Sequence, residues 1–222
     1  VRTPIGSYNG SLKNIKAHQL GATVIKEVLN RTGTYHDEID EVIMGQVLTA
    51  GAGQNPARQA SVIAGLPVSI PSHIINQVCG SGLRAVISGY QSIKLNEVKK
   101  VISGGQENMS MAPHSIYYRE NEIVKENELI NTLTNDGLID AFNKYHMGVT
   151  AENVANKLNI SREEQDNFAI KSQTKTQNAI FKKKFNEELT SVKLKDGYFL
   201  KDEHPRKNLE LSDLKKLKTV FK

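Results

Sequence analysis

Short apolar runs of strand length alternate with segments of helical periodicity over residues 1–110 of the chain. Runs rich in β-branched residues predict strands, and the patterns between them carry helix start or stop signals. The predicted strands cover 42–44, 73–78 and 101–103, and the predicted helices cover 16–30, 56–64 and 83–93. Strands that alternate with helices in this way indicate an α/β fold, with a parallel sheet and helices on both of its faces.

The single cysteine of the chain lies between the second predicted strand and the helix after it. Residues 76–82 are Asn-Gln-Val-Cys-Gly-Ser-Gly, so Cys79 is expected at a helix N-terminus. Unpaired N–H groups and aligned peptide dipoles make that position partly positive, which favours a thiolate. Gly80 and Gly82 have no Cβ and would let a ligand carbonyl approach the backbone N–H groups. The segment therefore predicts an activated nucleophile.

The functional interpretation of these residues has structural alternatives. A lone cysteine is more often a packing residue, although each glycine costs a helix interior about 1 kcal/mol unless something needs the space. Glu107, beyond the third predicted strand, is either a general base or, the interpretation we favour, a hydrogen-bonded structural carboxylate. The loop 51–54 could cradle phosphate, but no Gly-Lys-Ser/Thr follows it, which favours a turn or an interface.

The character of the sequence changes near residue 111, where Asn, Lys and Glu become frequent and the strand pattern fades. We therefore expect two domains, residues 1–110 and an inserted loop domain of residues 111–222. The opening Val-Arg-Thr-Pro at 1–4 resembles the end of a strand, so we expect the sequence to begin inside a longer protein.

Local signals predict several elements of the second half. Thr150 is expected to cap one helix. Ser161 and Glu164 form a capping-box pattern ahead of a long helix that reaches about Phe185. The Asp-Gly pair at 196–197 predicts the turn of a short hairpin.

Composition restricts the classes of protein that the chain can belong to. Of its 222 residues 38% are hydrophobic, and no apolar run reaches the ~18 residues that indicate a membrane span. The lone cysteine is compatible with a reducing compartment. The formal net charge of +5 is spread among acidic residues. That pattern favours a solvated surface or a site for phosphorylated small molecules over nucleic-acid binding.

Four segments together resemble the thiolase family over the whole length of the chain. They are Gly-Gln-Asn-Pro-Ala-Arg-Gln-Ala at 53–60, Asn-Gln-Val-Cys-Gly-Ser-Gly-Leu at 76–83, Gly-Gly-Gln-Glu-Asn-Met-Ser at 104–110 and Tyr-His-Met-Gly-Val-Thr-Ala-Glu-Asn-Val-Ala at 145–155. His146 before Met147 and Gly148 is more similar to the short-chain acetoacetyl-CoA branch than to the long-chain 3-ketoacyl-CoA branch. The resemblance implies a thiolase-like layered fold, here an incomplete first domain with the inserted loop domain.

The resemblance also implies roles for particular residues. Cys79 would accept an acetyl group from acetyl-CoA, and a second acetyl-CoA, deprotonated at its α-carbon, would attack the thioester to give acetoacetyl-CoA. No cofactor or metal is implied, because the coenzyme A thioesters are substrates. The further positions that match coenzyme A contacts in the family are Leu138, His146 and Met147 along the pantetheine channel, with Arg206 and Phe221 near the adenine and phosphate end.

Three motifs of the family have no match in the chain: Gly-His-Pro, Asn-Glu-Ala-Phe and Cys-x-Gly-Gly-Gly. In the family they belong to the C-terminal half and supply the base for the nucleophile, a bound water and the base for the α-carbon. We therefore expect the N-terminal part of an acetoacetyl-CoA thiolase. The alternatives are a degenerate, non-catalytic CoA-binding fragment and a longer-chain 3-ketoacyl-CoA thiolase.

The expected partners and location follow from the same resemblance. The complete protein would bind acyl-CoA as a homodimer or homotetramer, without nucleic acid and without insertion into a membrane. The cytoplasm is the expected compartment, and the mitochondrion and the peroxisome are the alternatives.

Overall fold

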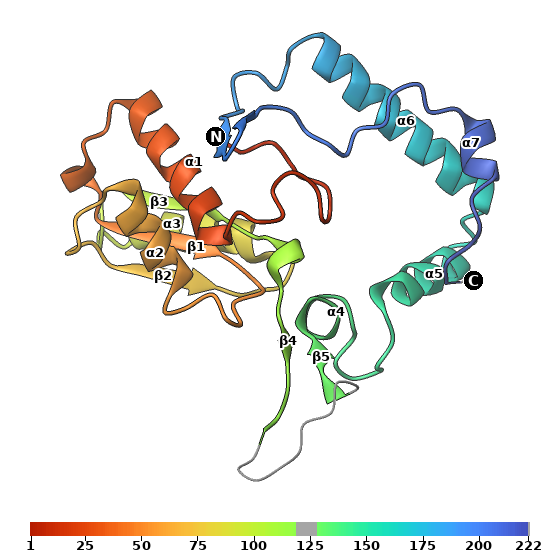
Figure 1. The fold of residues 1–222 in the computed structure, drawn as a ribbon, viewed down its shortest axis with the longest axis horizontal. Helices are drawn as coiled ribbons and strands as arrows, with labels where there is room; N and C mark the ends of the chain where they lie inside the picture. Colours follow the sequence, from red (N-terminus) through yellow and green to blue (C-terminus); the bar gives the residue numbers. More distant parts are fainter. Residues whose placement is uncertain (119–127, 222) are drawn as a thin grey trace.

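The computed structural model describes residues 1–118 and 128–221. Figure 1 shows a lobe built on a small sheet, and the later part of the chain extends from it in an arc of helices and loops. In chain order the elements are α1 (Ala17–Thr32), η1 (His36–Glu38), β1 (Glu41–Gly45), α2 (Pro56–Ala64), β2 (Ser72–Ile75), α3 (Ser81–Lys94), β3 (Val101–Gly105), η2 (Met109–Met111), β4 (His114–Ser115), β5 (Ile130–Asn131), α4 (Thr132–Gly137), α5 (Met147–Lys157), α6 (Arg162–Phe181), β6 (Val192–Leu194), β7 (Gly197–Phe199) and α7 (Leu211–Lys215).

Three parallel strands form the central sheet in the order β2-β1-β3. In the central strand, Val42 is in register with Ser72 of β2 and with Ile102 of β3. Parallel neighbours need a long crossover, and here α2 connects β1 to β2 while α3 connects β2 to β3. The predicted α/β fold with a parallel sheet is confirmed.

Helices cover both faces of this sheet (Figure 1). On one face, Val42 and Met44 of β1 pack in one buried cluster with Ile25 of α1 and Ala60 of α2. On the other face α3 lies very close to β1, since a Cβ added at Gly45 would come 2.4 Å from the carbonyl carbon of Ser81. The side chains of successive strand residues point to opposite faces, so the apolar run in β1 serves both layers.

Helix α3 turns its small residues toward the sheet and its large apolar residues away from it. Ala85 and Gly89 are buried, whereas Leu83 and Tyr90 are 68% and 61% exposed. A Cβ at Gly89 would lie 2.5 Å from the Ser103 hydroxyl of β3, so the contact between helix and strand needs a residue without a side chain. The apolar stripe that the sequence shows between Leu83 and Ile93 is therefore a surface of this chain.

Several local predictions are confirmed. Gly33 ends α1 in the left-handed conformation, with φ of 63°. Asn55 caps α2, and its side-chain oxygen accepts the backbone N–H of Arg58 at 3.2 Å. Ser161 and Glu164 form the capping box of α6. Strands β6 and β7 form the predicted hairpin.

Two predictions in the second half are wrong. Helix α5 begins earlier than expected, because the Nδ1 of His146 accepts the backbone N–H of Gly148 at 3.0 Å and caps it. Thr150 therefore lies within the helix and is not its cap. Helix α6 ends at Phe181 and not near Phe185, and Lys183 beyond it takes the left-handed conformation, with φ of 55°.

The segment from Phe185 to Glu203 folds back onto the N-terminus. The Arg2 guanidinium makes a two-pronged ion pair with Asp202, at 2.7 and 3.0 Å, and its Nε donates to Glu188 at 2.6 Å. A second apolar cluster joins the hairpin of β6 and β7 to residues near the start of the chain. Its buried members are Leu12, Leu20, Val192 and Phe199. The domain boundary near residue 111 stays a prediction.

We expect Asp202→Asn to lower the free energy of unfolding of the complete protein by about 1.5–3 kcal/mol at pH 7, the usual size of a hydrogen bond to a charged group. The hydrogen bonds from Arg2 hold the pKa of Asp202 below its ordinary value. A carboxylate with a lowered folded-state pKa stabilises the fold above its ordinary pKa, and this stability is lost as the pH falls through the lowered value. Urea unfolding at several pH values should therefore show that the free energies of unfolding of the wild type and of Asp202→Asn become equal in acid.

The control is Glu188→Gln. The Glu188 side chain is 45% exposed against 12% for Asp202, so its loss should cost only about 0.2–1 kcal/mol. Equal losses for the two variants, or a loss for Asp202→Asn that does not change with pH, would contradict the assignment.

Candidate active site

Cys79 is exposed and lines a pocket of about 450 Å³. The floor is formed where β1 and β3 end, at Gly45 and Gly105, and Leu133 and Leu138 close the pocket from the side of α4. In open α/β sheets ligands sit beyond the carboxyl ends of the strands. The structure thus brings together Cys79 and the loop after β3, as the alternation of strands and helices predicts.

The backbone just before Cys79 differs from the predicted strand. Strand β2 ends at Ile75, and Val78 has φ of 48° with 48% of its surface exposed. Positive φ is a genuine outlier for a β-branched residue, so Val78 belongs to a tight turn. Helix α3 begins at Ser81 with Gly80 as its N-cap, which places Cys79 one residue before the cap. The prediction that Cys79 lies next to a helix N-terminus is confirmed, with this shift.

Glu107 acts as a structural carboxylate at the edge of the pocket. Its Oε2 accepts the backbone N–H groups of Val47 and Leu48 at 2.9 and 3.1 Å, and its Oε1 accepts that of Asn108 at 3.2 Å. The bonds from Val47 and Leu48 hold the loop after β1 against the loop after β3, and the bond from Asn108 lies within the loop after β3. They support the structural interpretation of Glu107 over that of a general base.

Two buried glutamines extend this support. The Gln106 side chain donates to Gln46 at 2.9 Å, and Gln46 in turn donates to the carbonyl of Leu48 at 3.0 Å. The sequence did not single out Gln46, because a glutamine after a strand has no pattern that distinguishes it from a surface residue.

Four of the five residues that match coenzyme A positions form a connected series of contacts, and they are Leu138, Met147, His146 and Phe221. Leu138 lines the pocket of Cys79, and its carbonyl accepts the backbone N–H of Met147 at 2.8 Å. The His146 ring stacks on Phe221, with ring centroids 5.0 Å apart and planes at 20°. Phe221 also covers Gly148, where a Cβ would come 2.0 Å from the ring. The structure therefore joins the start of α5 both to the pocket and to the end of the chain.

Arg206 is not part of that series. It is exposed, and its backbone N–H donates to the side chain of Gln173 on α6 at 3.0 Å. The glycine-rich loop 51–54 is likewise held by its own helix, since the Gln59 side chain donates to the carbonyls of Ala52 and Gln54 at 2.8 and 2.7 Å. These bonds favour the turn interpretation of the loop over a phosphate cradle.

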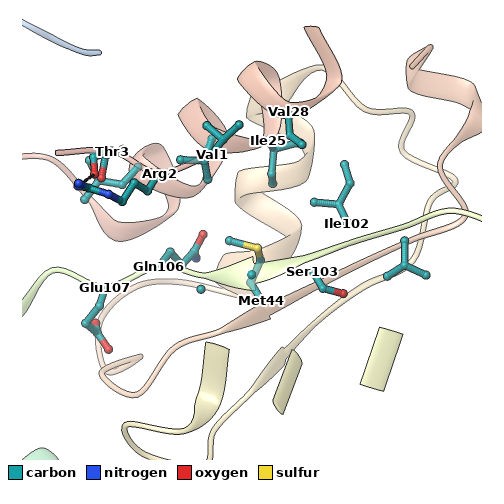
Figure 2. A pocket seen from close by; sticks show the side chains of 15 residues that line it. Val1, Arg2, Thr3, Ile25, Val28, Met44, Ile102, Ser103, Gln106 and Glu107 are labelled. Atoms are coloured by element: carbon teal, nitrogen blue, oxygen red, sulfur yellow. Dashed lines mark hydrogen bonds between the residues drawn. The ribbon is translucent and has the colours of Figure 1, made fainter. Parts of the chain in front are cut away.

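A second cavity, of about 370 Å³, lies between α1 and the open edge of β3. Figure 2 shows Val1 beside Ile25, with Met44 and Ile102 facing them from the sheet. Cys79 does not line this cavity. Within the described residues, no cluster of His, Cys, Asp or Glu could hold a metal ion. The pocket that Cys79 lines, at the carboxyl ends of the strands, is the candidate active site.

Comparison with known proteins identifies the family. The family profile described as "Thiolase, N-terminal domain" matches residues 1–222. Acetyl-CoA acetyltransferase of Pseudomonas aeruginosa is 46% identical over 228 residues, which cover 100% of this chain and 58% of that protein. Cytosolic acetyl-CoA acetyltransferase of Rattus norvegicus is 47% identical over 225 residues, covering 100% of this chain and 57% of that protein.

The fold agrees with these sequence relationships. The crystal structure of the Bacillus anthracis acetyl-CoA acetyltransferase matches with a TM-score of 0.93 at 33% identity, covering 100% of this chain and 57% of that one. The chain thus spans a little over half the length of these relatives. Because the family profile covers it from end to end, the chain belongs to the thiolase family.

Proposed function

We propose that the complete protein is an acetyl-CoA C-acetyltransferase that condenses two acetyl-CoA molecules into acetoacetyl-CoA and coenzyme A, and that also catalyses the reverse thiolysis. The observation that carries the proposal is the exposed Cys79 thiol in a pocket at the strand ends, next to the N-terminus of α3. The names of the relatives from Pseudomonas aeruginosa and Rattus norvegicus support the same activity.

The proposed reaction has two steps. The thiolate of Cys79 attacks the carbonyl carbon of acetyl-CoA, the carbon–sulfur bond to coenzyme A breaks, and the acetyl group is left on Cys79 as a thioester. The second acetyl-CoA then loses its α-proton, and the resulting carbanion attacks that thioester. A carbon–carbon bond forms, the bond to Cys79 breaks, and the thiolate is restored as acetoacetyl-CoA leaves.

The residues of this chain would contribute charge stabilisation and position. Helix α3 has 14 residues, and the partly positive N-terminal end of its dipole lies beside Cys79. The backbone N–H of Cys79 would be one donor to the oxyanion that forms at the acetyl carbonyl. The bases for the nucleophile and for the α-carbon would come from sequence beyond this chain, as the resemblance implies.

Coenzyme A would bind along the connected residues that begin at Leu138 and end at Phe221. In this proposal Leu138, His146 and Met147 contact the pantetheine arm, and Phe221, which stacks on the His146 ring, lies toward the adenine and phosphate end. Arg206 would meet the phosphates from its exposed position near α6. The continuous contacts from Leu138 to Phe221 support the first assignments, and the positive charge of Arg206 supports the last.

Acetylation of Cys79 tests the proposal. Incubating the complete protein with acetyl-CoA, followed by quenching in acid, should leave an acetyl group on the peptide that contains Cys79. Peptide mass spectrometry would identify it. Adding coenzyme A before the quench should remove the group, because the first step is reversible.

The control is Cys79→Ala, which should leave that peptide unmodified and abolish both condensation and thiolysis. An unacetylated Cys79 in an otherwise folded protein, or a Cys79→Ala variant with normal turnover, would contradict the proposed function. An unacetylated Cys79 would favour a non-catalytic CoA-binding protein over the proposed enzyme.

We further propose a cytoplasmic homo-oligomer that takes acyl-CoA as its partner. The rat relative is named as cytosolic, and the lone cysteine is compatible with a reducing compartment. No helix within residues 1–118 and 128–221 is both long and apolar enough to cross a membrane. Fractionation of the source cells and light scattering of the complete protein would test location and assembly.

A further inference from the structure

We propose that Ser81 is a positioning residue for the Cys79 thiol and that it acts through the backbone of Val78. The inference rests on the proposed role of Cys79 as the residue that accepts the acetyl group. Ser81 lies two residues after Cys79 in the first turn of α3, and its side chain turns back to the residues that precede the nucleophile.

The Ser81 hydroxyl uses both of its hydrogen-bonding roles on the turn before Cys79. It donates to the carbonyl of Val78 at 2.6 Å and accepts the backbone N–H of Gln77 at 2.8 Å. The backbone N–H of Ser81 donates to the same Val78 carbonyl at 3.1 Å. Ser81 is only 4% exposed, so water has little access to replace these bonds.

These bonds act on a residue in an unfavourable conformation. Val78 has φ of 48°, and a left-handed β-branched residue persists only where its surroundings hold it. Val78 is 48% exposed, so side-chain packing alone does not supply that restraint. Hydrogen bonds to the backbone do, since the Val78 carbonyl is held by Ser81 and its N–H donates to the Asn76 side chain at 3.0 Å.

The conformation of Val78 fixes the direction in which Cys79 leaves the turn. If Val78 relaxed to an ordinary φ, the peptide that joins it to Cys79 would rotate and the thiol would move in the pocket. Ser81 itself has a fixed place, because its backbone packs directly on Gly45 of the sheet. The Ser81 hydroxyl therefore holds the turn before Cys79 in a fixed position relative to the sheet.

A double-mutant cycle on the complete protein tests this role, with single-turnover acetylation of Cys79 by acetyl-CoA as the measurement. Ser81→Ala should lower the acetylation rate at saturating acetyl-CoA by about 10- to 100-fold, the range expected for a misplaced reacting group. The half-saturating concentration should change little, because in this proposal the Ser81 hydroxyl bonds to Val78 and Gln77 and not to coenzyme A.

Glycine at position 78 should suppress the defect, because glycine adopts positive φ without strain. Val78→Gly combined with Ser81→Ala should recover most of the lost rate. Val78→Ala is the matched control, since it also removes the exposed side chain but keeps the cost of positive φ. Its combination with Ser81→Ala should stay slow. A merely structural Ser81 would give the same result with either residue at 78.

Each outcome decides the question. A Ser81→Ala rate equal to that of the wild type, or equal recovery with glycine and alanine, overturns the positioning role and leaves the proposed function intact. An unacetylated wild-type protein overturns the proposed function and this role with it. If Ser81→Ala unfolds at the assay temperature, the comparison moves to melting: Val78→Gly must raise the melting temperature of that variant more than Val78→Ala does, and equal effects overturn the role.

Discussion

Expressed alone, the chain of 222 residues is expected to show no measurable thiolysis of acetoacetyl-CoA. Among the described residues, Cys79 and Glu107 are the ionisable ones that line the pocket, and the Glu107 carboxylate already accepts three backbone N–H groups. A base for the nucleophile and a base for the α-carbon would each contribute roughly 10²- to 10⁴-fold, and the pocket supplies neither. The loss of absorbance of acetoacetyl-CoA on addition of coenzyme A measures the rate.

The complete protein is the control for this prediction and should turn over under the same conditions. Cys79 of the isolated chain should still react with iodoacetamide, because the thiol is exposed. Labelling without turnover would show that the isolated chain has a reactive thiol but lacks the bases that the reaction needs. Measurable thiolysis by the isolated chain would contradict the proposed division of roles.

The isolated chain should also bind the dye ANS. Five apolar residues on the outer face of α3 are 39–68% exposed, and they are Leu83, Val86, Ile87, Tyr90 and Ile93. A continuous apolar helix face of this kind is unusual on a monomer. We expect strong ANS fluorescence and a broad thermal transition. A sharp cooperative melt without ANS binding would show that the exposed face is compatible with a stable monomer.

The order of strands and helices was predictable because its signals are local. Gly33 and Asn55 mark a helix end and a helix start through their own backbone and side-chain chemistry, and both occur as expected. The β-branched runs around Val42 and Ile102 have no helical periodicity, and they pair in one parallel sheet. The position of Cys79 beside a helix start follows from the same local pattern.

The orientation of α3 could not be predicted from periodicity. Its pattern shows which residues share a face, but the small side chains of Ala85 and Gly89 allow the closest approach to the sheet. The turn at Val78 was missed for a related reason. A valine normally favours a strand, and its carbonyl is held by Ser81, which lies outside the predicted strand.

The contacts of the candidate site also depend on residues far apart in the chain. Phe221 meets His146, and Glu107 meets the loop that begins at Val47, and neither contact has a periodic signal. Resemblance to a family matched His146 and Phe221 to separate coenzyme A positions and did not predict that they touch, and the choice between catalytic and structural roles for Glu107 needed its three N–H partners. Sequence therefore located Cys79 beside a helix start more directly than it located the residues that surround the pocket.

Gly45→Ala is expected to have the largest effect of any single substitution at the floor of the pocket. An added Cβ would lie 2.4 Å from the carbonyl carbon of Ser81 and 2.5 Å from the nitrogen of Gly82, and backbone atoms cannot move aside as a flexible side chain can. The first turn of α3 must therefore shift away from β1. We expect a loss of about 1–3 kcal/mol in the free energy of unfolding of the complete protein, the usual cost of overpacking.

The same shift should reduce activity, because it moves Ser81 and with it the turn that carries Cys79. A displacement of about 1 Å at a reacting group can cost 10²-fold, so the acetylation rate of Cys79 should fall by an amount of that order. Gly104→Ala is the matched control on the neighbouring strand, since the nearest atom to its added Cβ is the Met44 sulfur at 3.9 Å, an ordinary contact. Urea unfolding and single-turnover acetylation of both variants measure the two effects. Similar results for Gly45→Ala and Gly104→Ala would show that the close contact between β1 and α3 does not set the position of the nucleophile.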